Sequence, residues 1–439
     1  MVSLEEISKE MMETHMPSGI DKIGKRKYKD FEVKYINQIK KGLDNGKYKF
    51  SKYKQVLKIK NEKVEPRMIS IPTLRDRLML KYIHINYLKD IESRKPLYMI
   101  VDELYTNINS NKYDSYLKLD IKQFYDSINI RILNEILRNK GLDDNIRKII
   151  ICSLKTNTVD ILKNSKTDSR EKEKNRINKG VPQGIIISNA LAEIYLENFD
   201  IEMKSKNIFF CRFVDDIVIL FDSNKYNAAD IKLEVMNYLS VLKLKINKEK
   251  LKEGKISDGI NFLGYRFINN LITLEDRIIQ KKEKKLERVI FDYKNSKNDK
   301  IRNNMNFLKW KLKVEIFGFI SGGKRYGWLN TYSSINDETI MHKLDCTVRK
   351  IIKRSGIIIN FDLPKFSKSY NIIKNNITNK MNNFDKKYET LEKKKDFISS
   401  TLCIDINRLN SENTEEIFRD MIRKTIYELE KDLDFKYKF

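Results

Sequence analysis

The chain has 439 residues, enough for about two to four domains and a large core. Its 15 glycines and 6 prolines are too few for collagen-like, linker-like or turn-dense all-β architectures and favour helices. Lys and Arg number 87 against 61 Asp and Glu, and this net charge of +26 predicts a polyanionic partner such as nucleic acid. The alternative explanation of this charge is an ordinary basic protein from an AT-rich genome.

Cysteine usage and hydropathy indicate a reducing, aqueous setting. The four cysteines and three histidines show no metal-ligand spacing, which disfavours zinc sites and a disulfide framework. No run of 18 apolar residues occurs, and the mean hydropathy is −0.56. Residues 1–15 carry early acidic residues and no apolar stretch, unlike a secretory signal. We therefore expect a cytoplasmic protein that makes no contact with membranes.

Hydrophobic spacing predicts helices and then a strand in the first part of the chain. Residues 1–60 have helical spacing and few breakers, typical of a helical lead-in. Residues 67–72 alternate and end in proline, which indicates a strand. Thr73 then caps a predicted helix through Ile83.

A second strand and a basic loop follow. Residues 116–121 alternate as a strand does, and a helix over 132–140 is expected to stop at Gly141. Residues 163–179 lack apolar periodicity and hold seven basic residues against three acidic ones. They predict an exposed loop, which either contacts nucleic acid or is a solvated insertion.

The middle of the chain combines helices with paired strands. Residues 188–202 and 228–242 carry apolar stripes typical of helices. Between them, residues 208–221 form two apolar runs interrupted by Asp215 and Asp216, which predicts two strands joined by a tight turn. A hairpin turning at residues 269–270 is predicted over 262–274, and the rest of the chain is predicted to be helical.

Three carboxylates are candidates for a metal centre. Asp215 and Asp216 lie in a turn between buried strands, where their repulsion is costly without a compensating cation. Asp120 ends another apolar strand, and its arrival at the same place would complete a Mg²⁺ site for phosphoryl transfer. Most Asp-Asp pairs, by contrast, are solvated turns.

Six segments, in order, resemble the motifs of the reverse transcriptase family over about residues 55 to 340. The fingers motifs are matched by PRMISIPTLRDRLM, motif A by LKLDIKQFYDSI, motif B by GVPQGIIISN, motif C by RFVDDIVIL, motif D by LKINKEK and the primer-grip motif E by FLGYRF. One departure is Phe213, which stands where the family commonly has Tyr.

The resemblance implies an α+β fold of the right-hand polymerase type. It has fingers, a palm of antiparallel sheet plus helices, a helical thumb and then a helical C-terminal region. The expected boundaries are 1–110 for the lead-in and fingers, 111–275 for the palm with a fingers insertion near 130–180, 276–345 for the thumb and 346–439 for the C-terminal region.

The resemblance also assigns the catalytic metals and nucleotide contacts. Asp120 and Asp215 would share two Mg²⁺ ions, Asp216 would support them, and Ile121 would contribute its backbone carbonyl. The residues expected to contact or protonate the nucleotide are Lys60, Arg67, Tyr125, Gln183 and Lys250. Alternative interpretations are solvated charges for Lys60 and Lys250 and a core aromatic for Tyr125.

A basic segment at the start of the predicted thumb is the candidate RNA-binding surface. We expect its lysines to follow a phosphate backbone; they are Lys281, Lys282, Lys284 and Lys285. The competing interpretation is a solvated helix face, because Glu283 and Glu287 offset part of the charge. Residues 163–179 are the next candidate.

The subgroup follows by elimination. The acidic cluster of a ribonuclease H, a zinc-type nuclease and the retron signatures NAxxH and VTG are not found in the sequence. What remains resembles bacterial defence-associated reverse transcriptases of the abortive-infection type, with RNA as template or scaffold, dNTPs as substrates and DNA as product. The alternatives are a group II intron-like or retron-like enzyme and an RNA-binding maturase-type scaffold. The sequence leaves open the template, the primer and the oligomeric state, including a homo-oligomer.

Overall fold

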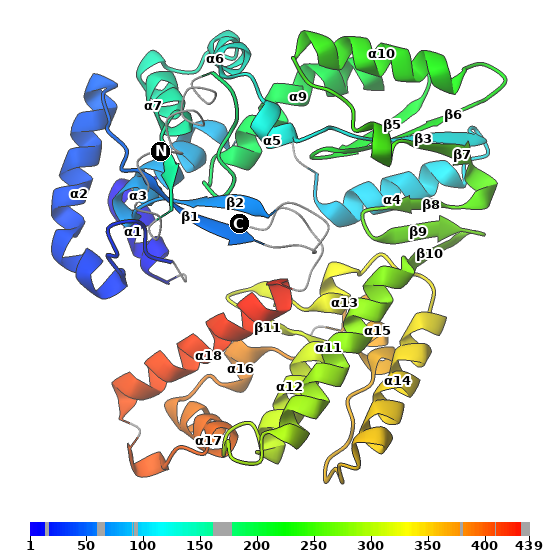
Figure 1. The fold of residues 1–439 in the computed structure, drawn as a ribbon. Coiled ribbons are helices and arrows are strands. Elements are labelled where there is room, and N and C mark those ends of the chain that lie inside the picture. Colours follow the sequence, from blue (N-terminus) through cyan, green and yellow to red (C-terminus); the bar gives the residue numbers. More distant parts are fainter. Residues whose placement is uncertain are drawn as a thin grey trace. The chain divides into compact units, whose positions relative to one another are not determined.

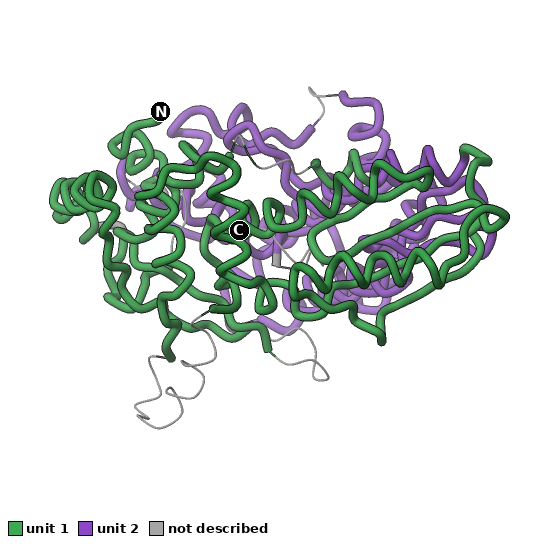
Figure 2. Tube along the Cα trace, turned by 90° about the horizontal axis from the view of Figure 1, so that it is seen from above, with its two compact units in different colours: residues 1–100, 110–255, 439 green, residues 101–109, 256–438 purple. Residues whose placement is uncertain are grey.

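The computed structural model describes residues 1–13, 17–58, 66–89, 91, 95–160, 178–377, 381–408 and 410–431 (Figure 1). It confirms the predicted α+β class, with many helices, antiparallel sheets and a helical C-terminal region. The chain forms two compact units (Figure 2). Unit 1 comprises residues 1–100 and 110–255, and unit 2 comprises residues 101–109 and 256–438.

Unit 1 opens with helices and a small sheet. Its first elements are α1 (Leu4–Glu13), α2 (Lys25–Asn45), β1 (Tyr53–Lys58), β2 (Arg67–Ile71), α3 (Leu74–Ile83), a π-helical turn (His84–Leu88) and the start of α4 (Leu97–Ile108). The predicted cap is confirmed, because the Thr73 side chain accepts a hydrogen bond from the Asp76 N–H.

The prediction that residues 1–60 are helical throughout is wrong at its end. β1 pairs antiparallel with β2, from Lys54 opposite Ile71 to Lys58 opposite Arg67. It also pairs parallel with β4 (Thr158–Val159). These partners lie far along the chain, so local spacing carries no sign of them.

The central sheet of unit 1 has the strand order β5-β6-β3-β7 and is antiparallel throughout. Its strands are β3 (Ser115–Asp120), β5 (Phe209–Phe213), β6 (Asp216–Phe221) and β7 (Lys252–Lys255). The inner strand β6 is almost wholly buried beyond its first residue, as the apolar run predicts. We call this sheet the palm sheet.

Further helices complete unit 1. They are α5 (Phe124–Ser127), α6 (Ile130–Asn139), α7 (Asp144–Leu154), α9 (Ser188–Lys204), α10 (Ala228–Val241) and the 3₁₀ turn η2 (Lys248–Lys250). The helix α10 runs along one face of the sheet (Figure 1). The helix α9 packs on β5, where the rings of Phe199 and Phe210 lie 5.5 Å apart, edge to face. The predicted helices over 132–140, 188–202 and 228–242 are confirmed.

Unit 2 begins with a three-stranded antiparallel sheet. The strands of this sheet are β8 (Ile260–Phe262), β9 (Tyr265–Ile268) and β10 (Leu271–Leu274), and the 3₁₀ turn η3 (Ile256–Asp258) precedes them. The predicted turn is confirmed, since Asn269 and Asn270 both adopt the left-handed conformation that a two-residue hairpin loop requires. This hairpin, which the sequence assigned to the palm, lies in unit 2.

The remainder of unit 2 is helical apart from one small hairpin. Its elements are α11 (Asp276–Asn295), α12 (Met305–Phe317), β11 (Phe319–Ser321), β12 (Lys324–Tyr326), α13 (Trp328–Thr331), α14 (Thr339–Ser355), α15 (Phe366–Lys374), α16 (Phe384–Lys387), α17 (Leu391–Leu402), η5 (Ile406–Arg408) and α18 (Ser411–Lys431).

An aromatic cluster joins α12 to the C-terminal helices. Its buried members include Trp310 and Val314 of α12, Phe384 and Tyr388 at α16, and Ile422 of α18. The predicted thumb and C-terminal region therefore share one core.

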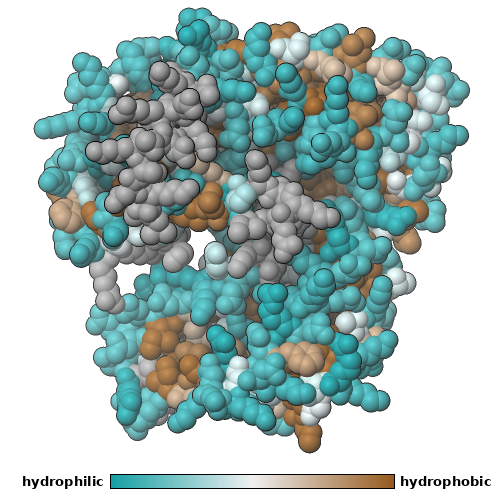
Figure 3. All heavy atoms as spheres, viewed as in Figure 1, coloured by the Kyte–Doolittle hydropathy of each residue, from teal (hydrophilic) through white to brown (hydrophobic). Residues whose placement is uncertain are grey.

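The surface is consistent with the polar composition. Hydrophilic residues predominate on the face shown in Figure 3, with apolar residues in separate patches. None of the helices in the described part of the chain is long and apolar enough to cross a membrane.

Candidate active site

Three carboxylates meet at one end of the palm sheet. Asp120 is the last residue of β3 and lies opposite Asp216, the first residue of β6. Phe213 pairs with Asp216, so Val214 and Asp215 form a two-residue turn between β5 and β6. Ligand oxygens of the three carboxylates all lie within 4.8 Å of one another. Asp120 and Asp215 are 3% and 7% exposed, so their charges cannot be relieved by solvent alone.

The turn that carries Asp215 has a strained backbone. Val214 has φ 59°, in the left-handed region that a β-branched residue rarely adopts. Two hydrogen bonds flank it: the Arg212 Nη1 donates to the Val214 carbonyl at 2.8 Å, and the Ile121 N–H donates to the Asp215 carbonyl at 3.0 Å. These bonds fix the backbone on both sides of the carboxylate.

Arg212 connects the turn to helix α9. Its guanidinium donates to Glu193 at 2.7 Å and to Asp200 at 2.5 Å, and its side chain is 3% exposed. Burial acts to lower the pKa of Arg212, but the charges of Glu193 and Asp200 outweigh it and raise that pKa. The guanidinium therefore stays charged, and the turn is held by a buried ionic network.

The carboxylate cluster has the donor set of a divalent-cation site. Carboxylate oxygens are hard ligands, and Mg²⁺ prefers them to nitrogen or sulfur. Asp120 and Asp216, on adjacent strands, and Asp215, in the turn before β6, supply three such groups. The residues present therefore fit the metal that the resemblance implies.

Lys250 also reaches this cluster. Its Nζ donates to Asp120 Oδ2 at 2.7 Å. Asn247 holds the other side of the same residue, through its Nδ2 at 3.4 Å from Oδ1 and its backbone N–H at 2.7 Å from the Asp120 carbonyl. Both belong to the segment around η2, so the predicted motif D lysine lies directly on a candidate metal ligand.

The described residues that were predicted to contact the nucleotide lie in unit 1, as the carboxylate cluster does. Tyr125 is 3% exposed, and its hydroxyl donates to Asn189 Oδ1 at 2.7 Å. The Gln183 carbonyl accepts from the Ser70 N–H at 2.7 Å, which joins the loop of Gln183 to β2. Arg67 begins β2 and is half-buried. Lys60 lies outside the described residues, as do residues 163–177 of the basic loop.

Glycine is required where this loop meets β2. Gly184 has φ 106°, and a Cβ there would come within 2.7 Å of the Ser70 carbonyl oxygen and of an Ile69 methyl carbon. Only glycine permits both this conformation and this close approach.

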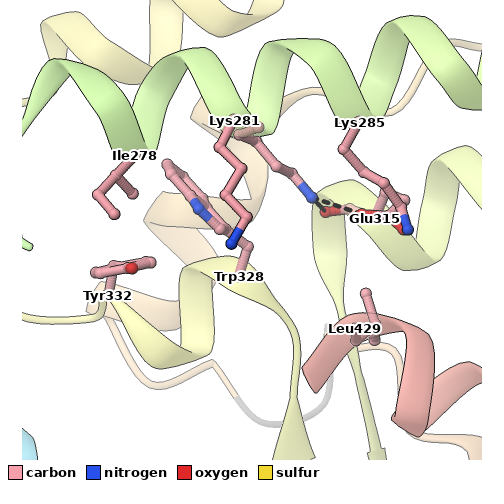
Figure 4. A pocket seen from close by; sticks show the side chains of 8 residues that line it. Ile278, Lys281, Lys285, Glu315, Trp328, Tyr332 and Leu429 are labelled. Atoms are coloured by element: carbon pink, nitrogen blue, oxygen red, sulfur yellow. Dashed lines mark hydrogen bonds and ion pairs between the residues drawn. The ribbon is translucent and has the colours of Figure 1, made fainter. Parts of the chain in front are cut away.

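The four lysines predicted to bind RNA divide into different environments. Lys282 is 5% exposed, and its Nζ donates to Glu315 Oε2 at 2.7 Å and to the Glu315 carbonyl at 2.9 Å. Lys285 lies 3.8 Å from the same carboxylate. Lys284 is exposed, and Lys281 extends into the pocket lined by Trp328, Tyr332 and Leu429 (Figure 4).

Lys282 is therefore buried and paired with Glu315, unlike the solvent-facing lysine that the sequence predicted. Helix α11 packs on α12, and this packing buries the ammonium against Glu315. Its partner is 33 residues away in the chain, so the sequence alone presented Lys282 as a surface charge.

Sequence reasoning also missed four residues that support the site: Arg212, Glu193, Asp200 and Asn247. One signal was present for the first three. Glu193 and Asp200 are seven residues apart on one helix face, and Arg212 lies on the strand that follows. A buried acid and a half-buried acid beside a buried arginine side chain indicate an ionic network.

An antiparallel palm sheet with three carboxylates at one end can hold divalent cations that assist phosphoryl transfer. Residues 58–267 match the family described as "Reverse transcriptase (RNA-dependent DNA polymerase)". Over these residues, just under half of the chain, the protein is similar to that family, and the match includes every residue of the carboxylate cluster.

Other similarities are more distant. "Protein YkfC" from Escherichia coli K12 is 24% identical over a stretch that covers 34% of this chain and 45% of that protein, so the chain spans less than half of this relative. Apo telomerase from Candida tropicalis is 14% identical with a TM-score of 0.37, covering 60% of this chain and 63% of that one. A Candida albicans telomerase bound to a fragment of telomeric RNA is 15% identical with a TM-score of 0.40, covering 88% and 69%. At these TM-scores the two telomerases add no argument about function.

Proposed function

We propose that the protein is an RNA-directed DNA polymerase that extends a primer 3′-hydroxyl with dNTPs. The observation that carries this proposal is the convergence of Asp120, Asp215 and Asp216 within a domain that matches reverse transcriptases. The high net positive charge of +26 supports a nucleic-acid partner.

The reaction joins the primer 3′-oxygen to the α-phosphorus of the dNTP and breaks the bond to the β-phosphate, so pyrophosphate leaves. Asp120 and Asp215 would hold two Mg²⁺ ions, with Asp216 beside them. Bound there, the ions would lower the pKa of the 3′-hydroxyl and neutralise charge on the triphosphate.

The chain's own residues have complementary roles in this proposal. Arg67 would lie along the triphosphate, where a planar guanidinium suits phosphate oxygens. The ring of Tyr125 would lie under the sugar and exclude a 2′-hydroxyl. The ammonium of Lys250, once released from Asp120, would donate a proton to the departing pyrophosphate.

The test is Asp215→Asn in a primer-extension assay on an RNA template. We expect activity to fall at least about 100-fold, because one ligand charge is lost. The fold should persist, since the substitution also relieves repulsion within the cluster. Asp230→Asn, which removes an exposed carboxylate from α10, is the matched control. Near-normal extension by Asp215→Asn would refute the assignment.

A second candidate is an RNA-binding scaffold without polymerase activity, as in maturase-type proteins. Such a scaffold gains nothing from buried acids beside a polyanion, so the Asp120–Asp215–Asp216 cluster favours the enzyme. Wild-type protein that binds RNA but fails to extend any primer would favour the scaffold.

We further propose that the enzyme acts in bacterial antiphage defence, on the basis of the resemblance of its sequence to the defence-associated group. The test is the plating efficiency of phages on cells that express the wild type or Asp215→Asn. Protection that depends on Asp215 is the expected result, and equal plating on both would contradict this role.

A further inference from the structure

Unit 2 contains a group of four lysines from three different elements, which we call the lysine cluster. Lys309 and Lys313 are four residues apart on α12 and so share one helix face. Lys368 belongs to α15, which packs against α12. Lys387 is the last residue of α16. Folding thus brings together positive charges that are as much as 78 residues apart.

The lysine cluster has no carboxylate partner among the described residues, whereas neighbouring lysines do. Lys311, also on α12, pairs with Glu428, Lys374 of α15 pairs with Glu338, and Lys394 of α17 pairs with Glu415. Unit 2 therefore contains carboxylates that pair with lysines, but Glu428, Glu338 and Glu415 pair with lysines outside the lysine cluster.

Aromatic contacts hold two of the ammonium groups in place. The Nζ of Lys309 lies 5.7 Å from the centre of the Phe361 ring, and that of Lys387 lies 4.7 Å from the Tyr388 ring. Tyr388 follows α16, whose Phe384 stacks on Phe319 at 4.3 Å inside the aromatic cluster. The ammonium of Lys387 is thus held against a ring of the aromatic cluster and that of Lys309 against a partly buried ring, so these two groups need little ordering when a ligand binds.

These lysines act on one another electrostatically. Partial burial, followed by the charges of Lys313 and Lys309, lowers the pKa of Lys387 to about 8. Burial, Lys309 and Lys368 likewise lower the pKa of Lys313. Keeping like charges together costs free energy, and a bound anion would offset that cost.

We propose that the lysine cluster binds the phosphodiester backbone of a single nucleic-acid strand. Several cations from three elements can each contact a different phosphate of one strand, which a single small anion cannot offer. Lys309, Lys368 and Lys387 are exposed to solvent and so can be reached by such a strand. The choice of nucleic acid rests on the proposed function, but the lysine cluster shares no residue with the candidate active site or with the Lys281–Lys285 segment.

The experiment compares two variants with the same loss of charge. One is Lys309→Gln/Lys313→Gln/Lys387→Gln. The control removes three lysines that are exposed and already paired, as Lys148→Gln/Lys225→Gln/Lys374→Gln. Binding of a fluorescein-labelled unstructured 20-nucleotide RNA, and of the DNA of the same sequence, is measured by anisotropy at pH 7 over a series of salt concentrations.

We expect the cluster variant to bind about tenfold more weakly at 0.1 M salt. Its plot of log affinity against log salt should be less steep by about 2, since each neutralised phosphate of a single strand contributes about 0.7. The control should stay within about threefold of wild type. Equal weakening for RNA and DNA supports backbone recognition, weakening for only one identifies which strand is held, and unchanged binding of both overturns the proposal.

A second measurement uses the wild-type protein and so does not depend on the fold of a variant. Acetylation of each lysine at pH 8 is followed by mass spectrometry with and without the RNA. Protection of Lys309, Lys313 and Lys387 is expected, and equal acetylation overturns the proposal. Wild-type primer extension is measured in parallel, so a failure of the lysine cluster is distinguishable from a failure of the polymerase assignment.

Discussion

The contact between Lys250 and Asp120 predicts that the protein's own ammonium competes with the catalytic metal. The Nζ of Lys250 donates a hydrogen bond to Asp120 Oδ2 at 2.7 Å, and a metal ion bound to Asp120 would need the same oxygen. Metal binding must therefore break this ion pair first. Replacing Lys250 by Gln should remove the competitor and tighten metal binding, even though it removes the proposed proton donor and slows polymerisation.

The expected size follows from the geometry. Asp120 is buried, but the Lys250 side chain is 51% exposed, so solvent screens the pair and its strength is reduced to about 1 kcal/mol. Loss of that contact corresponds to about a fivefold lower dissociation constant.

The assay is a titration of Mn²⁺ in the absence of nucleotide, with free Mn²⁺ measured by electron paramagnetic resonance. Lys248→Gln is the matched control, because it removes an exposed charge from the same 3₁₀ turn without contacting Asp120. Unchanged or weaker Mn²⁺ binding by Lys250→Gln would refute the reasoning, as would equal tightening in both variants.

Three further predictions concern other parts of the structure. Arg212→Met should weaken Mn²⁺ binding and raise the KM for dNTPs, because the turn of Asp215 loses its support; a change in thermal stability alone would contradict this positioning role. Tyr125→Ala should admit ribonucleotides in a primer-extension assay, and unchanged selectivity would favour a core-aromatic role. Lys282→Met should lower the free energy of unfolding by about 3 kcal/mol, because Glu315 stays buried without its partner. In a denaturant titration, the double variant with Glu315→Leu should regain most of that lost stability.

The sequence predicted three of the four palm-sheet strands, β3, β5 and β6, because their signals are local, and it did not predict β7. The alternating residues of β3 and the two apolar runs around Asp215 each specify a strand and the turn where it ends. Since a tight turn between two consecutive strands pairs them antiparallel, the position of Asp215 and Asp216 at one end of this hairpin also followed. Their approach to Asp120 depends on pairing between strands about 95 residues apart, and only the resemblance predicted it.

Features that depend on distant packing were not predictable from spacing. β1 becomes a strand because β2 and β4 pair with it. Lys282 is indistinguishable from its neighbours in the sequence until α12 brings Glu315 against it. The Arg212 network was recognisable in principle from its residue types, although the bond to the Val214 carbonyl was not.

The aromatic cluster that joins α12 to α18 has a consequence for how this chain can evolve. Trp310 and Val314 form one side of that core, and Ile422 and Leu429 form part of the other. Divergence in the C-terminal helices is therefore constrained by the face that α12 presents, so substitutions on the two sides should change together among relatives. A C-terminal region exchanged between such proteins would need to bring its matching α12 with it.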